Sequence, residues 1–314
     1  MMKTKYIYGI FCTIVIVWLI LGFLIYLKCK SSGFEHPGQF GDTFGALNCL
    51  FSGLAFAGVI LTMQIHDKER KRDAIVDQFF KMLDYHQNNI NNIVTTEIRI
   101  PTSESSSEKP EDKGTVRIIK LVTNDAKEIK GRKAFVEYKM QIRHLLRLVK
   151  EINQENNYSL SNLQIADITY CIFFFGANKE WKDFMTKYLN EYNKPSTLVD
   201  QILAKIAANP KYALGRTNQT DLSTYFRNIY NAIKLIDDTE LLDSKEKEQY
   251  VKILRSQLSN PELYILLFNV LSRFGEKWKE HKYVTTYNLF DNMPEGYCEG
   301  YEPKAIFVNN QQVS

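Results

Sequence analysis

The sequence predicts a mainly α-helical protein, with an N-terminal hairpin of two transmembrane helices followed by a cytoplasmic α-helical domain. Two uncharged stretches, residues 6–27 and 43–65, each exceed the roughly 20 residues that span a bilayer core as a helix. A charged, glycine-containing link, residues 28–42, separates them. Beyond the hairpin, apolar residues recur at three- and four-residue spacing, which is typical of amphipathic helices.

Basic residues flank the two stretches and predict an orientation. Lys3 and Lys5 precede the first stretch, and four basic residues lie within residues 68–72 after the second. Because basic residues favour the cytoplasmic side, we expect a multi-pass protein with both termini cytoplasmic and membrane lipid as a partner. The first stretch is longer than the apolar part of a secretory signal peptide and lacks a convincing cleavage site, which favours a retained anchor.

The second stretch differs from the first because it carries small residues at every fourth position. Gly45, Cys49, Gly53 and Ala57 would share one helical face and let another helix approach closely, and Asn48 would hydrogen-bond across helices. Two interpretations remain open for this transmembrane packing face. It either packs against the first span, or it joins copies of the chain into a homo-oligomer such as a pore.

The remaining pattern divides the chain into further segments. Residues 66–97 predict a helix that continues from the second span, either as a rigid link that transmits movement or as scaffolding. His86 lies on its apolar stripe and is expected to be a core histidine. Residues 98–130 form a variable region that opens with a polar, mobile loop, and residues 131–314 form the cytoplasmic helical domain.

Composition and motifs limit the classes of function. A net charge of +4 in 314 residues gives no electrostatic indication of a nucleic-acid partner. The five cysteines form no CxxC pair, as expected for free thiols in a reducing compartment. The sequence contains no glycine-rich phosphate loop, no HExxH motif and no GxSxG motif, so we expect no catalytic residues, no metal and no cofactor, and favour a non-enzymatic protein.

Two polar clusters interrupt the apolar helices of the C-terminal half, at residues 225–230 and 255–263. Arg227 and Arg255 are candidates to pair with a carboxylate such as Glu262, and Ser259 or Asn260 would cap the helix that contains Glu262. A buried structural network, a pocket for an anion or nucleotide, and a catalytic site are all compatible with these residues. The candidate ligand-binding or structural residues are Tyr225, Arg227, Tyr230, Arg255, Gln257, Glu262 and Asn269.

Several segments occur in an order that is similar to a known family. They are residues 40–48, 53–58, 79–83 with His86, 131–135, 225–230, 254–259 with Glu262 and Leu263, and Asn269 with Ser272 and Gly275. Together they resemble phage abortive infection proteins of bacteria (AbiC-like), over roughly residues 40–292. The resemblance implies antiphage defence at the bacterial inner membrane, in which the infected cell is arrested or killed, and it implies no particular chemistry.

Three hypotheses follow for how such a protein would act. In the first, the helical domain senses infection through a phage protein, a nucleic acid or a host partner protein, and the hairpin then perturbs the membrane. In the second, an unfamiliar enzyme site is built around Arg227, Arg255, Gln257 and Glu262. In the third, the domain is a binding module that sequesters a phage component.

Overall fold

The computed structural model describes residues 13, 15–20, 22–24, 26–27, 30, 37–96, 128–177, 179–191, 197–208, 214 and 217–307. The chain divides into two compact units, Met1–Lys71 and Arg72–Ser314, which we call unit 1 and unit 2 and treat separately. Residues 98–127, which make up nearly all of the predicted variable region, lie outside the described residues.

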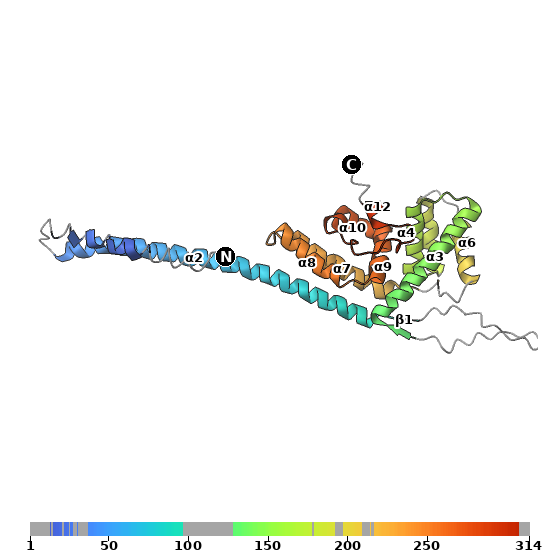
Figure 1. Ribbon diagram of the computed structural model, residues 1–314, viewed down its shortest axis with the longest axis horizontal. Helices are drawn as coiled ribbons and strands as arrows, with labels where there is room; N and C mark the ends of the chain where they lie inside the picture. Colours follow the sequence, from blue (N-terminus) through green and yellow to red (C-terminus); the bar gives the residue numbers. More distant parts are fainter. Residues whose placement is uncertain are drawn as a thin grey trace, which may run out of the picture. The chain divides into compact units, whose positions relative to one another are not determined.

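Helices make up most of the described chain (Figure 1). The predicted mainly α-helical class is therefore confirmed. The elements, in order, are α2 (Pro37–Asn92), β1 (Val94–Thr96), β2 (Glu128–Lys130), η1 (Gly131–Lys133), α3 (Ala134–Asn156), α4 (Asn162–Phe175), α5 (Lys179–Glu191), α6 (Thr197–Ala208), α7 (Gln219–Asp238), α8 (Ser244–Ser256), α9 (Asn260–Leu271), η3 (Arg273–Gly275), α10 (Glu276–Glu280), α11 (Tyr283–Thr286) and α12 (Pro303–Phe307).

The predicted transmembrane hairpin, and with it the multi-pass location with both termini in the cytoplasm, is contradicted. Among the residues that the structure describes, no helix combines the length and the apolar character needed to cross a membrane. Residues 43–65 are one part of α2, which begins at Pro37 and runs on through the charged residues 66–73 to Asn92. Glycines, Ser52 and Asn48 also interrupt its apolar side chains. Residues 6–12, 14, 21 and 25 of the other predicted span lie outside the description.

In unit 2, the last turns of α2 place one apolar face in the core of the domain. Phe79, Leu83 and Ile90 are buried at helical spacing, and His86 is buried between them. The helix ends at Asn92, and β1 then pairs antiparallel with β2, with Val94 opposite Lys130. The predicted core position of His86 is therefore confirmed.

A left-handed glycine connects the small sheet to the domain. Gly131 has a φ of +65°, and its N–H donates to the Ile93 carbonyl at 2.9 Å. Side chains with a Cβ rarely adopt this conformation, so a glycine suits the turn from β2 into η1. The turn fixes the position of the next residue, Arg132, beside the end of α2.

The core of unit 2 is built on α3, α4 and α9, which pack against one another (Figure 1). Most residues of α4 and α9 are buried. Both sequences are mainly apolar, with few polar residues such as Asp167 and Glu262, as expected for helices at the centre of a bundle. Capping boxes begin α4 at Ser161 and α8 at Asp243, so the first free N–H groups of these helices are satisfied.

A close backbone approach follows α9. A Cβ at Gly275 would lie 2.1 Å from the carbonyl oxygen of Val270, closer than real Cβ atoms approach another atom. Only glycine therefore fits where η3 turns the chain back over the end of α9 and into α10. This turn brings Lys277 and Trp278 of α10 to the wall of the groove described below.

Candidate functional site

A fully buried carboxylate, Glu262, lies in the first turn of α9 in unit 2. Its Oε2 accepts a hydrogen bond from the Ser259 backbone N–H at 2.8 Å and a second from the Ser259 hydroxyl. Ser259 is the N-cap residue of α9. A negative charge at this end of a helix is favoured by the free N–H groups and by the helix dipole. The start of α9 therefore stabilises a negatively charged side chain at position 262, although that side chain is buried.

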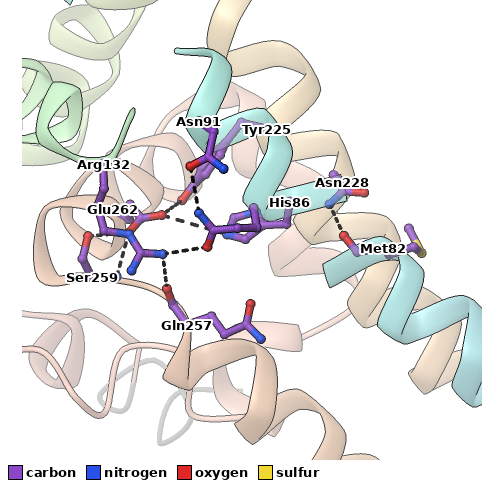
Figure 2. A network of polar contacts seen from close by, with 10 residues as sticks. Met82, His86, Asn91, Arg132, Tyr225, Asn228, Gln257, Ser259 and Glu262 are labelled. Atoms are coloured by element: carbon purple, nitrogen blue, oxygen red, sulfur yellow. Dashed lines mark hydrogen bonds and ion pairs between the residues drawn. The ribbon is translucent and has the colours of Figure 1, made fainter. Parts of the chain in front are cut away.

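Arg132 supplies the positive charge that this anion needs. Its Nε lies 3.2 Å from Glu262 Oε2, and its Nη2 donates to the Gln257 carbonyl at 3.0 Å (Figure 2). A longer contact of 3.5 Å joins Nη2 to Gln87 of α2. A buried charge is stable only when it is paired and hydrogen-bonded, so the ion pair with Arg132 offsets the free-energy cost of burying Glu262.

Tyr225 of α7 forms a hydrogen bond with the other carboxylate oxygen of Glu262. Its hydroxyl donates to Glu262 Oε1 at 3.2 Å, and its ring is fully buried. Burial, followed by the negative charge of Glu262, raises the pKa of Tyr225 well above its ordinary value. The hydroxyl therefore keeps its proton and acts as a donor, which joins α7 to the start of α9.

His86 of α2 completes this arrangement as a neutral ring. Its Nε2 is 4.0 Å from Glu262 Oε1, which is too long for a hydrogen bond, although the distance falls within the usual limit for an ion pair. Burial, and then the positive charge of Arg132, lower the pKa of His86 to about 4. Arg132 already balances the carboxylate, so we treat His86 as uncharged at neutral pH. Its ring packs against Tyr225 with the centroids 4.9 Å apart.

We call His86, Arg132, Tyr225, Ser259 and Glu262 the Glu262 cluster. Figure 2 shows its side chains converging from α2, η1, α7 and the start of α9. Neither ring nitrogen of His86 has a hydrogen-bond partner among the described residues. Glu262, by contrast, accepts from donors on both of its oxygens. A carboxylate so enclosed cannot reach a ligand from solvent, so the cluster is a structural junction.

A separate contact joins α7 to α2 one turn away from the cluster. Asn228 Nδ2 donates to the backbone carbonyl of Met82 at 2.8 Å (Figure 2). The acceptor is a carbonyl in the interior of α2 rather than at a helix end. Tyr225 and Asn228 therefore place the same face of α7 against the last turns of α2.

The other side of α7 borders an open groove with a volume of about 570 Å³, which we call the α7 groove. Its walls come from α4, α7, α9, η3 and α10. The lining residues are Phe174, Gln219, Ser223, Phe226, Arg227, Tyr230, Asn231, Asn269, Phe274, Lys277 and Trp278. This volume falls in the range of small-molecule sites, and the mixture of aromatic and polar side chains is typical of them.

The structure separates the candidate residues that the sequence groups together. Tyr225, Glu262 and the Gln257 carbonyl meet in or beside the Glu262 cluster. Arg227, Tyr230 and Asn269 line the α7 groove instead. Arg255 lies at neither place: its Nη1 donates to the Tyr287 carbonyl at 3.1 Å, and its Nη2 is 3.6 Å from Asp291 Oδ2.

Sequence reasoning missed Arg132 as the partner of Glu262. The arginine is far from Glu262 along the chain and stands in an unremarkable basic segment at residues 130–133. The available signal was its place between a glycine and the apolar face of α3. Ser259 and Asn260 were both expected as possible caps of α9, and the structure has Ser259 at the N-cap position with a capping box to Glu262.

The predicted small-residue face lies in the unit 1 part of α2. Gly45, Asn48, Cys49, Gly53 and Ala57 are all exposed. No described atom would lie within 4 Å of a Cβ built at Gly45 or Gly53, apart from the atoms of the helix itself. Packing of this face against another helix, and the homo-oligomer expected from it, stay predictions. Among the described residues, no group of His, Cys, Asp and Glu side chains forms a metal site.

Comparison with known proteins gives one match. Residues 217–297 match a family model described as "Putative phage abortive infection protein". No curated protein and no solved structure matches the chain. The resemblance recognised in the sequence is therefore confirmed for residues 217–297, which include Tyr225, Arg227 and Glu262 and exclude His86 and Arg132.

Replacing Glu262 with Gln should destabilise unit 2 by about 2–3 kcal/mol, because the amide leaves the charge of Arg132 without its partner and presents N–H groups to other donors. The free energy of unfolding in urea measures this cost.

Glu246→Gln is the matched control for this change. Glu246 occupies the same capping-box position in α8 and pairs with Arg72, but its side chain is partly exposed. We expect a cost below about 1 kcal/mol there, as for surface ion pairs. Equal costs at the two positions would contradict the role assigned to burial of Glu262.

His86 should make unit 2 less stable in mild acid. The pKa of His86 is lowered to about 4 in the folded chain, against 6.5 in the unfolded one, so the unfolded chain binds a proton first as the pH falls. The stabilising contribution is complete above pH 6.5 and is lost between pH 6.5 and 4, by about 3 kcal/mol.

Urea unfolding at a series of pH values tests this prediction. His86→Phe should remove this part of the pH dependence, whereas His66→Gln, at an exposed position of α2, should leave it unchanged. The account of His86 fails if His86→Phe and the wild type lose stability in parallel.

Proposed function

We propose that the chain is an abortive-infection protein of antiphage defence and that unit 2 is the part that senses infection. The match to the family model supports the defence role. It covers every element from α7 to α11, and so takes in most of the α7 groove and the Glu262 end of the cluster. These elements are the ones we assign to sensing.

The observation that carries the proposal is the double role of α7. One side of the helix contributes Phe226, Arg227 and Tyr230 to the α7 groove. The other side presents Tyr225 to Glu262 and Asn228 to the Met82 carbonyl of α2. A rotation or shift of α7 that improves contacts in the groove therefore alters the contacts that hold α2.

A ligand changes such an equilibrium only when it binds one arrangement better than the other. In this proposal a ligand in the α7 groove favours a second arrangement of α7, in which the contacts of Tyr225 and Asn228 are changed. Helix α2 continues from unit 2 into unit 1 without a break. In this proposal, release of its last turns is the signal that leads to arrest of the infected cell.

Plaque counts on bacteria carrying the gene test the proposal. Asn228→Ala should raise the counts toward those on cells without the gene, because it removes the contact between α7 and the Met82 carbonyl. The free energy of unfolding should fall by only about 1 kcal/mol, which is the net contribution of one hydrogen bond. Asn88→Ala, an exposed asparagine on the same end of α2, is the matched control and should protect like the wild type.

The same cells distinguish abortive infection from other kinds of defence. A culture with few phages per cell should survive, and one with more phages than cells should stop growing, because each infected cell is sacrificed. Survival of the heavily infected culture would contradict abortive infection. Full protection by Asn228→Ala would contradict the role of the α7–α2 contact.

A further inference from the structure

We propose that the α7 groove binds a free nucleoside phosphate, with the phosphate held by Arg227 and Lys277 and the base lying on the aromatic wall. This rests on the proposed function, since it names the class of ligand that unit 2 would sense. The charge, the aromatic rings and the size of the groove support this ligand.

Charge at the groove is of one sign. Arg227 of α7 and Lys277 of α10 are its charged lining residues, and no aspartate or glutamate is among them. Arg227 Nε donates to the Ser223 carbonyl at 3.1 Å, which holds the guanidinium in place. Among the described contacts, its two terminal nitrogens have no acceptor, and neither does the Lys277 ammonium. A phosphate is the anion that a guanidinium and an ammonium recognise best together.

Aromatic rings make up much of the rest of the groove lining. The rings of Tyr230 and Trp278 meet edge to face with their centroids 5.4 Å apart, and the rings of Phe174 and Phe274 lie 4.9 Å apart. Phe226 adds a fifth ring to the lining. Tyr230 and Phe274 are partly exposed, whereas Phe174, Phe226 and Trp278 are buried, so the first two rings offer the surface for stacking. Flat heteroaromatic bases stack on exposed aromatic rings with little regard to their identity. A ligand that joins a phosphate to a flat ring therefore satisfies both parts of the groove.

Amide side chains complete the lining and provide polar groups for a base edge. Asn269 is buried in α9, and its Nδ2 donates to the Tyr170 hydroxyl at 2.9 Å, which fixes the orientation of the amide. Gln219 and Asn231, on opposite ends of the lined part of α7, are exposed. Such groups donate and accept, as the edges of nucleobases do.

Size favours a single nucleotide over a polymer. A volume of about 570 Å³ accommodates one small ligand. Long nucleic acids are bound by extended basic surfaces, whereas the whole chain carries a net charge of only +4. The proposal is therefore a free mononucleotide rather than a strand of RNA or DNA.

Isothermal titration calorimetry of the full chain with AMP, GMP, CMP and UMP, in turn, tests this assignment. At least one of the four nucleotides should bind. The nucleoside of that nucleotide, and inorganic phosphate, should each bind at least about tenfold more weakly than the nucleotide, because each makes only part of its contacts. Arg227→Gln and Lys277→Gln should each weaken binding by about tenfold, the usual effect of losing one charge-assisted contact. Lys304→Gln, an exposed lysine of α12, is the control and should bind like the wild type.

Binding of none of the four nucleotides at millimolar concentration would overturn the proposal, as would binding that Arg227→Gln and Lys277→Gln leave unchanged. The proposal would also be overturned if inorganic phosphate bound as tightly as the nucleotide, because the groove would then recognise the anion and not the base. Plaque counts separate this failure from failure of the proposed function. If no nucleotide binds but Asn228→Ala still abolishes protection, the ligand assignment falls and the role of the α7–α2 contact stands.

Discussion

Burial of the Glu262 carboxylate is the constraint on which the arrangement of unit 2 depends. A charge with no exposure to solvent is stable only when donors surround it, and here they come from separate parts of the chain. Arg132 follows the small sheet, Tyr225 belongs to α7 and Ser259 begins α9. Each of these segments must be in place before Glu262 can be buried, so the cluster favours one packing of the domain over looser alternatives.

Part of this arrangement follows from sequence and part does not. Helical spacing predicted the mainly α class and the buried place of His86, and the residues before Glu262 predicted a cap for α9 at Ser259 or Asn260, because these signals depend on near neighbours. Pairing of Arg132 with Glu262 depends on a long-range approach that no local pattern encodes. The predicted hairpin is contradicted, because no helix among the described residues combines the length and the apolar character needed to cross a membrane.

The candidate residues that looked like one site are two places with different physical character. In the Glu262 cluster the carboxylate is buried and both of its oxygens accept hydrogen bonds from side chains or backbone of unit 2, so the cluster stabilises the packing of the domain. The α7 groove is open, carries Arg227 and Lys277 without a facing carboxylate, and is lined by aromatic rings. Helix α7 belongs to both places, with Tyr225 and Asn228 on its buried side and Arg227 and Tyr230 on the side of the groove. The proposed route from the groove to α2 depends on this division, because a shift of α7 at one place moves its contacts at the other.

Hydrogen exchange of the backbone amides at the end of α2 tests the central claim most directly. The claim is that the Glu262 cluster holds residues 79–92 against the rest of unit 2. Arg132→Gln removes the positive partner of Glu262 and leaves the side chains of α2 itself unchanged. Exchange in that variant should become faster in residues 79–92 and in α7, while α3 and α4 keep their protection. Protection of residues 79–92 equal to that in the wild type, or a uniform loss across all helices of unit 2, would contradict the account.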